Sequence, residues 1–385
     1  MEESSRADAG GVHQGMKAVV FFFEVHQPRR LRRYRMNEIG HSHNYFWDDK
    51  NSEILGRVAE RCYIPALKVF MDSGVRSSIS LSGTFMEQAL EYAPESIDAF
   101  KSYFRSGLSE PVAETYYHSL ASVWDEREFR EQVMMQVRAV GREFGLEPHT
   151  FRNTELIYSD NIARIIASMG FRRVLAEGTD SIVKENSPNH IYRSPAGISL
   201  FLRNYRLSDD ISFRFSNWKW PEYPLTADKY SEWIDSAPGE VANLFMDFET
   251  FGEHQVAETG IFEFMKALPR EFERRGIEML TLEEADRRFG KNSTLSVPQT
   301  TSWADTRRDL SPWLGNEMQK QAFNALIGIK RRDSTWRSLQ TSDHLYYMST
   351  GTSQDITVHE YFNPYKSPYY AFLSFMNVLQ DIELQ

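Results

Sequence analysis

The chain has 385 residues, of which 41% are hydrophobic, 25% charged and 14% aromatic. This composition supports a sizeable core and excludes a mainly disordered chain. Acidic residues outnumber basic ones by 54 to 44, and the net charge of −10 argues against nucleic acid as a partner. The single cysteine, Cys62, excludes an internal disulfide and a cysteine-based zinc site, so we expect a buried thiol there.

The first fifteen residues are polar and predict a disordered tail before a folded unit that begins near residue 16. They lack the basic-then-apolar order of a signal peptide. No apolar run approaches the roughly 18 residues that a membrane-spanning helix needs. We therefore expect a cytoplasmic protein that does not contact a membrane.

Residues 18–90 alternate between strand and helix patterns. A nearly continuous apolar run at residues 18–25 predicts a strand buried on both faces. Residues 53–71 have a helical pattern, with Pro65 at a kink or boundary. Residues 75–81 predict a second strand, and a helix follows from residue 85.

The alternation continues to about residue 290. The clearest helix spans residues 128–144, whose apolar residues form one stripe that Gly145 ends. The other predicted elements are an extended segment at 110–117, helices at 162–169, 261–275 and 282–289, and strands at 171–176, 241–248 and 277–280. Repeated strand–helix units predict a parallel sheet, in a barrel or a doubly wound arrangement.

The pattern changes after residue 290. A loop-like stretch is followed by predicted helices at residues 317–331 and 371–379. We therefore divide the chain into a tail (1–15), an α/β unit (16–290) and a helical carboxy-terminal region (291–385) that packs against the α/β unit.

Four polar clusters stand where predicted strands end, at residues 24–27, 114–118, 153–155 and 247–249. The carboxyl ends of parallel strands face the functional site in α/β folds. Glu155 and Asp247 are the best candidates for a nucleophile and a proton donor, because partial burial should separate their proton affinities. Such a pair of carboxyl groups is what cleavage of a glycosidic bond requires. Glu249 would point the same way as Asp247 if the strand continued past it.

Histidines and tryptophans offer further candidates. A metal site is a rival interpretation, supported by the His41–Ser42–His43 triplet, but no HExxH motif and no cysteine pair occurs. A neutral histidine can instead donate to a sugar hydroxyl. Trp303 and Trp313 are the tryptophans most suited to exposed sugar platforms. Glycine-rich phosphate loops are absent, and we expect neither a metal nor a cofactor.

Five segments together resemble the ordered sequence regions of glycoside hydrolase family 57. They are FEVHQPRRL, AETYYHSL, FRNTELIYSD, FMDFETFGEHQ and LQTSDHLYYMS, and the closest resemblance is to the α-amylase-like archaeal members. The resemblance runs from about Met16 to Pro368. It implies an α/β fold, an incomplete parallel (β/α)7 barrel with a helical carboxy-terminal region completing the cleft. It also implies a retaining mechanism on α-1,4-glucans.

The resemblance implies that Glu155 is the nucleophile and Asp247 the general acid/base. The residues that we expect to bind substrate are His26, Gln27, Glu114, His118, Glu249, His254, Trp303, Asp343 and His344. The third region departs from the family pattern, because it reads Phe151 to Tyr158 without the tryptophan and the Cys-Ala pair that often flank the nucleophile. Both candidate catalytic carboxyl groups are nevertheless present.

The leading hypothesis is an α-amylase-like enzyme acting on an α-glucan or maltooligosaccharide. The same residues would make a 4-α-glucanotransferase if a second sugar replaced water as the acceptor. A metal-dependent carbohydrate deacetylase is another alternative and would need a His/His/Asp ligand set. The last alternative is a glucan-binding protein without catalytic activity.

Overall fold

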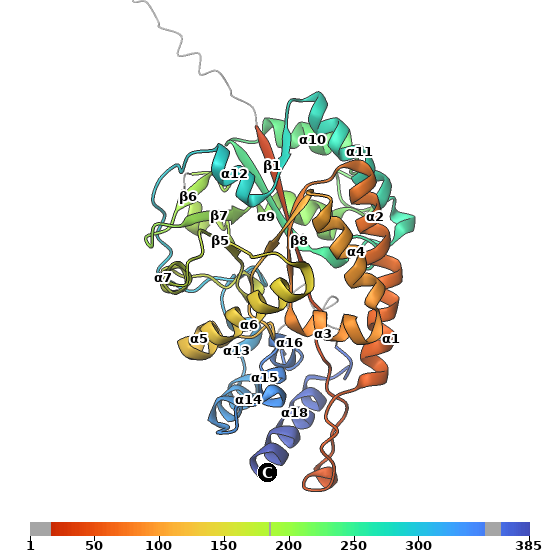
Figure 1. Cartoon of the computed structure of the whole chain (residues 1–385), viewed down its shortest axis with the longest axis vertical. Helices are drawn as coiled ribbons and strands as arrows, with labels where there is room; N and C mark the ends of the chain where they lie inside the picture. Colours follow the sequence, from red (N-terminus) through yellow and green to blue (C-terminus); the bar gives the residue numbers. More distant parts are fainter. Residues whose placement is uncertain (1–16, 185, 351–362) are drawn as a thin grey trace, which may run out of the picture.

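The computed structural model of the chain describes residues 17–184, 186–350 and 363–385 (Figure 1). The predicted tail at residues 1–15 lies outside the described residues. The strand predicted at residues 18–25 is confirmed, and it lies at the centre of a largely parallel sheet.

The strands form two sheets of orders β3-β2-β1-β8 and β4-β5-β7-β6, with β9 pairing the start of β1. Their bounds are β1 (Ala18–Val25), β2 (Ser77–Leu81), β3 (Ser109–Val112), β4 (Thr150–Phe151), β5 (Arg173–Glu177), β6 (Ile191–Arg193), β7 (Ser199–Arg203), β8 (Val241–Asp247) and β9 (Glu278–Leu280). Among the described strands only β6 pairs antiparallel, with β7.

Two sparse contacts join the sheets into a curled, incompletely closed barrel. An isolated parallel bridge links Ala113, just after β3, to Phe151 of β4. On the other side, the Asn204 N–H after β7 donates to the carbonyl of Asn243 in β8 at 2.8 Å. Strands β8, β1, β2, β3, β4, β5 and β7 thus follow one another round the curl. The predicted fold class, an incomplete parallel (β/α)7 barrel, is confirmed.

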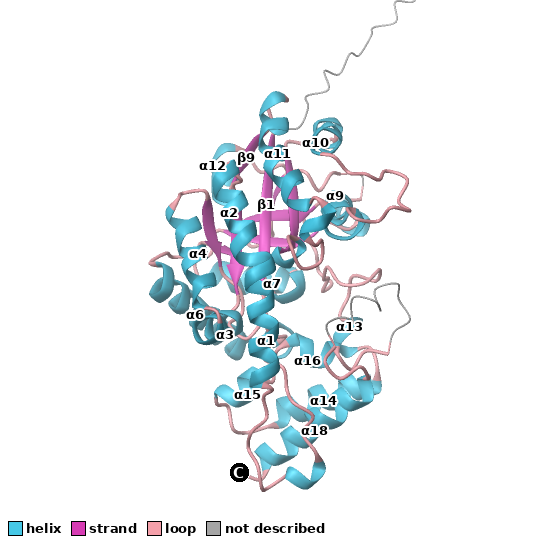
Figure 2. Cartoon of the chain, turned by 90° about the vertical axis from the view of Figure 1, so that its right-hand side faces the viewer, coloured by secondary structure: helices cyan, strands magenta, loops and turns pink. Residues whose placement is uncertain are grey.

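Helices surround the strands on the outside and continue beyond them (Figures 1 and 2). The main helices of the α/β part are α1 (Asp48–Val58), α2 (Ile64–Ser73), α3 (Gly83–Tyr92), α4 (Pro94–Arg105), α6 (Glu126–Phe144), α7 (Asp160–Ser168), α10 (Ala227–Ser236), α11 (Ile261–Arg274) and α12 (Leu282–Arg288). A π-helical turn, Ala59–Tyr63, separates α1 from α2, and Pro65 lies in the first turn of α2 as predicted. Gly145 ends α6 in the left-handed conformation that glycine adopts without strain.

The carboxy-terminal helices gather beyond the carboxyl ends of the strands (Figure 1). They are α13 (Ser311–Leu314), α14 (Glu317–Gly328), α15 (Ser334–Ser338), α16 (Ser342–Tyr346) and α18 (Pro368–Glu383). Isolated bridges tie residues of this part to the barrel, including Thr301 to Tyr158 and Thr341 to Ser119. The division of the chain at residue 290 stays a prediction.

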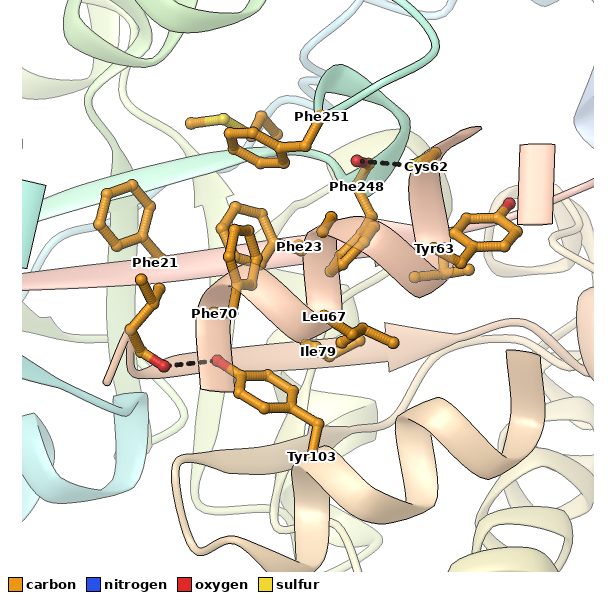
Figure 3. Packing of buried hydrophobic residues seen from close by; sticks show 14 of the residues in the cluster. Phe21, Phe23, Cys62, Tyr63, Leu67, Phe70, Ile79, Tyr103, Phe248 and Phe251 are labelled. Atoms are coloured by element: carbon orange, nitrogen blue, oxygen red, sulfur yellow. Dashed lines mark hydrogen bonds between the residues drawn. The ribbon is translucent and has the colours of Figure 1, made fainter. Parts of the chain in front are cut away.

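Strand β1 separates two cores because its side chains alternate between its faces. Val19, Phe21 and Phe23 pack outward into the cluster under α2 and α11, whereas Val20 and Phe22 pack inward. Figure 3 shows the outward cluster, in which the ring of Phe70 from α2 meets those of Phe23, Phe248 and Phe251. Cys62 is buried as expected, and its thiol donates to the carbonyl of Phe248.

Among the described residues, no helix combines the length and the apolar character needed to cross a membrane.

Truncation of Phe70 should destabilise the barrel strongly, since its ring is fully buried and contacts four other aromatic rings. We expect Phe70→Ala to lower the free energy of unfolding by about 3–5 kcal/mol in urea denaturation. The matched control is Phe213→Ala, because the Phe213 side chain is exposed, and its loss should cost no more than about 1 kcal/mol. Equal losses in the two variants would contradict the packing described here.

Candidate active site

The inner face of the barrel changes from apolar to charged at the carboxyl ends of the strands. Glu24, Glu177, Arg203 and Asp247 occupy the inward positions there, each two residues beyond an apolar inward residue of its own strand. Those apolar residues are Phe22, Leu175, Phe201 and Phe245. The register pairs Glu24 with Asp247 and Glu177 with Arg203 on neighbouring strands. The period of two along each strand therefore brings four charged groups together above the apolar interior.

Arg152 is a fully buried cation in this layer. Its two terminal nitrogens donate to the two carboxylate oxygens of Glu24, and its guanidinium lies over the Trp303 ring at 4.7 Å. A second cation, Arg203, donates to Glu177 at 3.1 Å and lies 5.6 Å from the same indole ring. Pairing of this kind is needed because a buried charge without a partner is strongly destabilising.

Glu155 lies on a short 3-10 turn just after β4, with its side chain about one fifth exposed. Its Oε2 accepts a hydrogen bond from the Trp303 indole at 2.8 Å, and its Oε1 accepts one from the Ser342 hydroxyl at 3.1 Å. The backbone N–H of Trp303 also donates to the backbone carbonyl of Glu155 at 3.1 Å. The backbone of Glu155 has φ 57° and ψ 26°, a left-handed conformation that costs a non-glycine residue energy and is concentrated at functional sites.

The two candidate catalytic carboxyl groups have pKa values displaced in opposite directions. Burial raises the pKa of Glu155, but the hydrogen bond and charge of His118, with the charge of Arg152, outweigh burial and hold it below its ordinary value. Burial raises the pKa of Asp247, and the charge of Glu155 adds to that rise while His254 opposes it. The two displacements have the directions that a nucleophile and a proton donor need.

His118 is buried between carboxylates. Its Nδ1 lies 3.1 Å from both Glu114 and Glu24, and its Nε2 lies 3.3 Å from Oε1 of Glu155. Its ring stacks on that of His26, with ring centres 3.9 Å apart and planes 17° apart. Both nitrogens of His118 therefore face protein groups, and it lies beneath the exposed surface of the site.

His26 and Asp343 lie at the exposed side of this stack. The Nδ1 of His26 lies 2.8 Å from the Ser82 hydroxyl and its Nε2 lies 3.1 Å from Asp343. Burial lowers the pKa of His26. Burial would raise the pKa of Asp343, but its hydrogen bond to His26 and nearby positive charge hold it well below its usual range. The structure thus brings Asp343, in α16, to the end of β1.

Glu249 does not continue the direction of Asp247, as the sequence suggested, because β8 ends at Asp247 and a 3-10 turn (Phe248–Thr250) follows. Its carboxyl turns instead toward Tyr63, whose hydroxyl donates to it at 2.5 Å, and toward the Gln27 amide at 3.5 Å. Burial, with the charge of Asp247, raises the pKa of Glu249 to about 8.

The remaining predicted site residues have different surroundings. His254 lies in the loop after Asp247, and burial lowers its pKa while the charge of Asp247 opposes that shift. His344 is buried with its ring 5.8 Å from that of Phe375, and burial lowers its pKa to about 4. The expected exposure of Trp313 is wrong, because its side chain is 1% exposed and packs in the core of the carboxy-terminal helices.

The metal interpretation has some geometric support, because ligand atoms of His26, His118 and Asp343 lie within 4.8 Å of one another. A metal bound by two imidazoles lies in the plane of each ring, along the nitrogen lone pair. The nearly parallel stack of His26 on His118 directs the two lone pairs side by side, so they do not converge on a single point. Glu24, Glu114 and His118 form a second group of neighbouring ligand atoms, but both oxygens of Glu24 already accept hydrogen bonds from Arg152, so this arrangement also fits hydrogen bonding better than chelation.

Sequence reasoning missed several members of the site. The members that were not predicted are Arg152, Ser342, Tyr63 and the Glu177–Arg203 pair. An arginine directly between a strand and the candidate nucleophile was the one available signal for Arg152, because a cation there needs a carboxylate partner. The contacts of Ser342 and Tyr63 depend on tertiary folding and left no comparable signal.

The raised pKa of Glu249 generates a prediction for stability against pH. Because the folded-state pKa of about 8 exceeds the ordinary value of 4.5, the folded chain holds this proton more tightly than the unfolded chain. The resulting stabilisation is complete below pH 4.5 and is lost as the pH rises toward 8.

Glu249→Gln retains an acceptor oxygen for Tyr63 and removes the titration. We expect its unfolding midpoint to fall less than that of the unmodified protein between pH 5 and pH 8.5. Glu95→Gln, at an exposed carboxyl of α4, serves as the matched control and should track the unmodified protein. Parallel profiles for all three proteins would refute the protonated state of Glu249.

Comparisons with known proteins identify the family of the chain. The model of the family described as Glycosyl hydrolase family 57 matches residues 20–298. A protein of Methanocaldococcus jannaschii named "Putative alpha-amylase" is 42% identical over 395 residues, covering 95% of this chain and 84% of the relative.

Solved structures share the fold at low sequence identity. A GH57 branching enzyme from Thermococcus kodakaraensis has a TM-score of 0.64 at 14% identity, over 92% of this chain and 88% of that one. A 4-α-glucanotransferase from Thermococcus litoralis has a TM-score of 0.60 at 17% identity, over 90% of this chain. The match covers 54% of the glucanotransferase, so the present chain spans about half of its length. Given the extent of the family match and the close archaeal relative, the chain belongs to glycosyl hydrolase family 57.

Proposed function

We propose that the protein is a retaining α-glucan hydrolase, α-amylase-like and acting on α-1,4 linkages, with Glu155 as nucleophile and Asp247 as general acid/base. The observation that carries the proposal is the convergence of Glu155, from the turn after β4, and Asp247, from the end of β8, where the charge of Glu155 acts on Asp247 and the two pKa values are displaced in opposite directions. A retaining glycosidase needs one ionised and one protonated carboxyl group at the same site.

The first step would form a glycosyl-enzyme. A carboxylate oxygen of Glu155 attacks the anomeric carbon, the glycosidic C–O bond breaks, and Asp247 gives its proton to the departing oxygen. In the second step Asp247 removes a proton from water, the water oxygen bonds to the anomeric carbon, and Glu155 leaves as a carboxylate. Trp303 and Ser342, which donate to the two oxygens of Glu155, would hold the nucleophile in place throughout.

Support for an α-glucan substrate comes from the relatives. The 42% identical protein carries the name "Putative alpha-amylase", and one solved structure that shares the fold is named a 4-α-glucanotransferase. Water and a sugar hydroxyl would attack the same glycosyl-enzyme, so transfer to a second glucan is an alternative outcome with the same catalytic residues.

The catalytic roles are tested with Glu155→Gln and Asp247→Asn, assayed on maltoheptaose. We expect turnover to fall at least about 10³-fold in each variant, because each carboxyl group performs a separate chemical task. The matched controls Glu95→Gln and Asp98→Asn, both on the exposed face of α4, should retain the unmodified rate. A folded variant of Glu155 or Asp247 with near-normal turnover would exclude that residue from catalysis.

The two roles are separated with α-maltosyl fluoride, whose leaving group needs no proton. We expect Asp247→Asn to release a burst of fluoride and then stall at the glycosyl-enzyme, whereas Glu155→Gln gives no burst.

Analysis of the maltoheptaose products decides the acceptor, since longer oligosaccharides require transfer and shorter ones alone mean hydrolysis. The first-formed reducing end should be the α-anomer, and a β-anomer would rule out retention.

The deacetylase alternative is tested by removing metal ions. Because the stacked histidines do not converge on one point, dialysis against EDTA should leave maltoheptaose cleavage unchanged. Release of acetate from an acetylated sugar that EDTA abolishes and Zn²⁺ restores would favour the deacetylase instead. Binding of glycogen in a pull-down without product formation would favour a glucan-binding protein without catalytic activity.

A further inference from the structure

His118 lies between the buried carboxylates Glu24 and Glu114 on one side and the candidate nucleophile Glu155 on the other. Its side chain is 2% exposed, so solvent does not reach it as it reaches Glu155. Oxygens of Glu24, Glu114 and Glu155 lie 3.1, 3.1 and 3.3 Å from its ring nitrogens, and both nitrogens are engaged. A residue so enclosed acts on the substrate only through the groups that surround it.

The contacts decide the protonation state of His118. A neutral imidazole has one N–H and one lone pair, and the lone pair would repel whichever carboxylate faced it. Hydrogen bonds from both nitrogens, Nδ1 to Glu114 and Nε2 to Glu155, require the imidazolium, and its positive charge also faces Glu24. Burial lowers the pKa of His118, but the charge of Glu24 and the hydrogen bonds to Glu114 and Glu155 outweigh it and raise the pKa well above 6.5.

The charges that face His118 come from every surrounding element. They are Glu24 from β1, Glu114 from the segment after β3, Glu155 from the turn after β4, Arg152 paired with Glu24, and His26 with Asp343 on the stacked side. The carboxylates among them outnumber the cations. A positive charge on His118 therefore reduces an excess of negative charge in the layer.

The orientation of His118 is also fixed. Its ring is held against that of His26, which is bound by Ser82 and Asp343, while Arg152 holds Glu24 by two hydrogen bonds. His118 has φ 49°, a left-handed backbone that a histidine adopts at an energetic cost. Both the backbone and the stack thus direct Nε2 of His118 at Oε1 of Glu155.

We propose that His118 is a positioning residue whose permanent positive charge keeps Glu155 ionised and correctly oriented, and that it thereby sets the acidic limit of the reaction. The proposal rests on the assignment of Glu155 as nucleophile. His118 donates a hydrogen bond throughout and transfers no proton, so the two chemical steps remain those of Glu155 and Asp247. Glu24, Glu114 and Arg152 act one contact further away, by keeping His118 charged and in place.

The central test is the pH profile of His118→Gln on maltoheptaose. Glutamine can still donate an N–H but carries no charge, so the carboxyl of Glu155 should need a higher pH to ionise. We expect the acidic limb of kcat/KM to move upward by about one pH unit or more, the effect of removing a cation within hydrogen-bond distance of a carboxylate. The rate at pH 8 and the KM should change much less, because at that pH Glu155 is ionised in both proteins.

A purely structural role would lower activity equally at all pH values and leave the acidic limb where it is. That result in a folded His118→Gln protein would overturn the proposal. His41→Gln, an exposed histidine in the loop after β1, is the matched control and should reproduce the unmodified profile.

Removing one cation beside two buried glutamates can prevent folding, so a second variant keeps the charge balanced. The double variant His118→Gln/Glu114→Gln removes one positive and one negative charge together, and we expect the same upward shift of the acidic limb. Neutron diffraction from the unmodified protein at pH 7.5 provides a test without substitution. Deuterons on both ring nitrogens of His118 would support the proposal, and a single deuteron would overturn it.

Covalent labelling distinguishes failure of this proposal from failure of the proposed function. A 5-fluoro-α-glucosyl fluoride should trap the glycosyl-enzyme, and peptide mapping identifies the labelled residue. A label on Glu155 with an unmoved acidic limb in His118→Gln would refute only the role of His118. A label on another residue would refute the assignment of Glu155 and, with it, the role of His118.

Discussion

Neutralisation of charge inside the barrel is the constraint on which the site depends. Apolar side chains at alternate strand positions fill the interior of the barrel. On several strands the next inward-facing residue, two positions further along, is charged. An apolar layer offers no hydrogen bonds, so each charge above it has to be balanced by a neighbour. Arg152 balances Glu24, and Arg203 balances Glu177. Asp247 belongs to this charged layer, Glu155 lies next to it on the turn after β4, and both side chains remain partly exposed.

The carboxy-terminal part supplies groups that the barrel lacks. Trp303 and Ser342 hydrogen-bond both oxygens of Glu155, and Asp343 reaches His26. These contacts span well over a hundred residues of sequence. Correct placement of the proposed nucleophile therefore requires that the helices after the barrel have folded onto it, and the two parts of the chain form one functional unit.

Periodicity predicted much of the barrel from the sequence. The apolar runs at β1 and β8 and the stripe on α6 are confirmed, because burial on both faces of a strand or on one face of a helix leaves a direct trace in the residue pattern. The stretch that contains β6, β7 and α10 gave no such trace, so Arg203 was missed with its strand. The polar clusters at strand ends come together at the carboxyl ends of the strands, and a site at that place stays a prediction.

The details of the site depend on contacts that sequence does not encode locally. The turn at Phe248–Thr250 changed the expected direction of Glu249, and within this turn the ring of Phe248 packs in the aromatic core. Trp313 stands in a polar stretch and is nevertheless buried by the helices that fold over it. Strain at Glu155 was equally invisible, since a left-handed glutamate depends on the surrounding structure to hold it.

The contact of both Arg152 and Arg203 with the ring of Trp303 has an evolutionary consequence. Each guanidinium is committed both to an aromatic face and to its own glutamate, so no single one of these positions can drift alone. Homologues that lose the arginine at position 152 should have lost the acid at position 24 as well, and a smaller residue at position 303 should accompany altered cations at positions 152 and 203. The barrel interior would then change by coordinated sets, which would make the charge layer the slowest-evolving part of the protein.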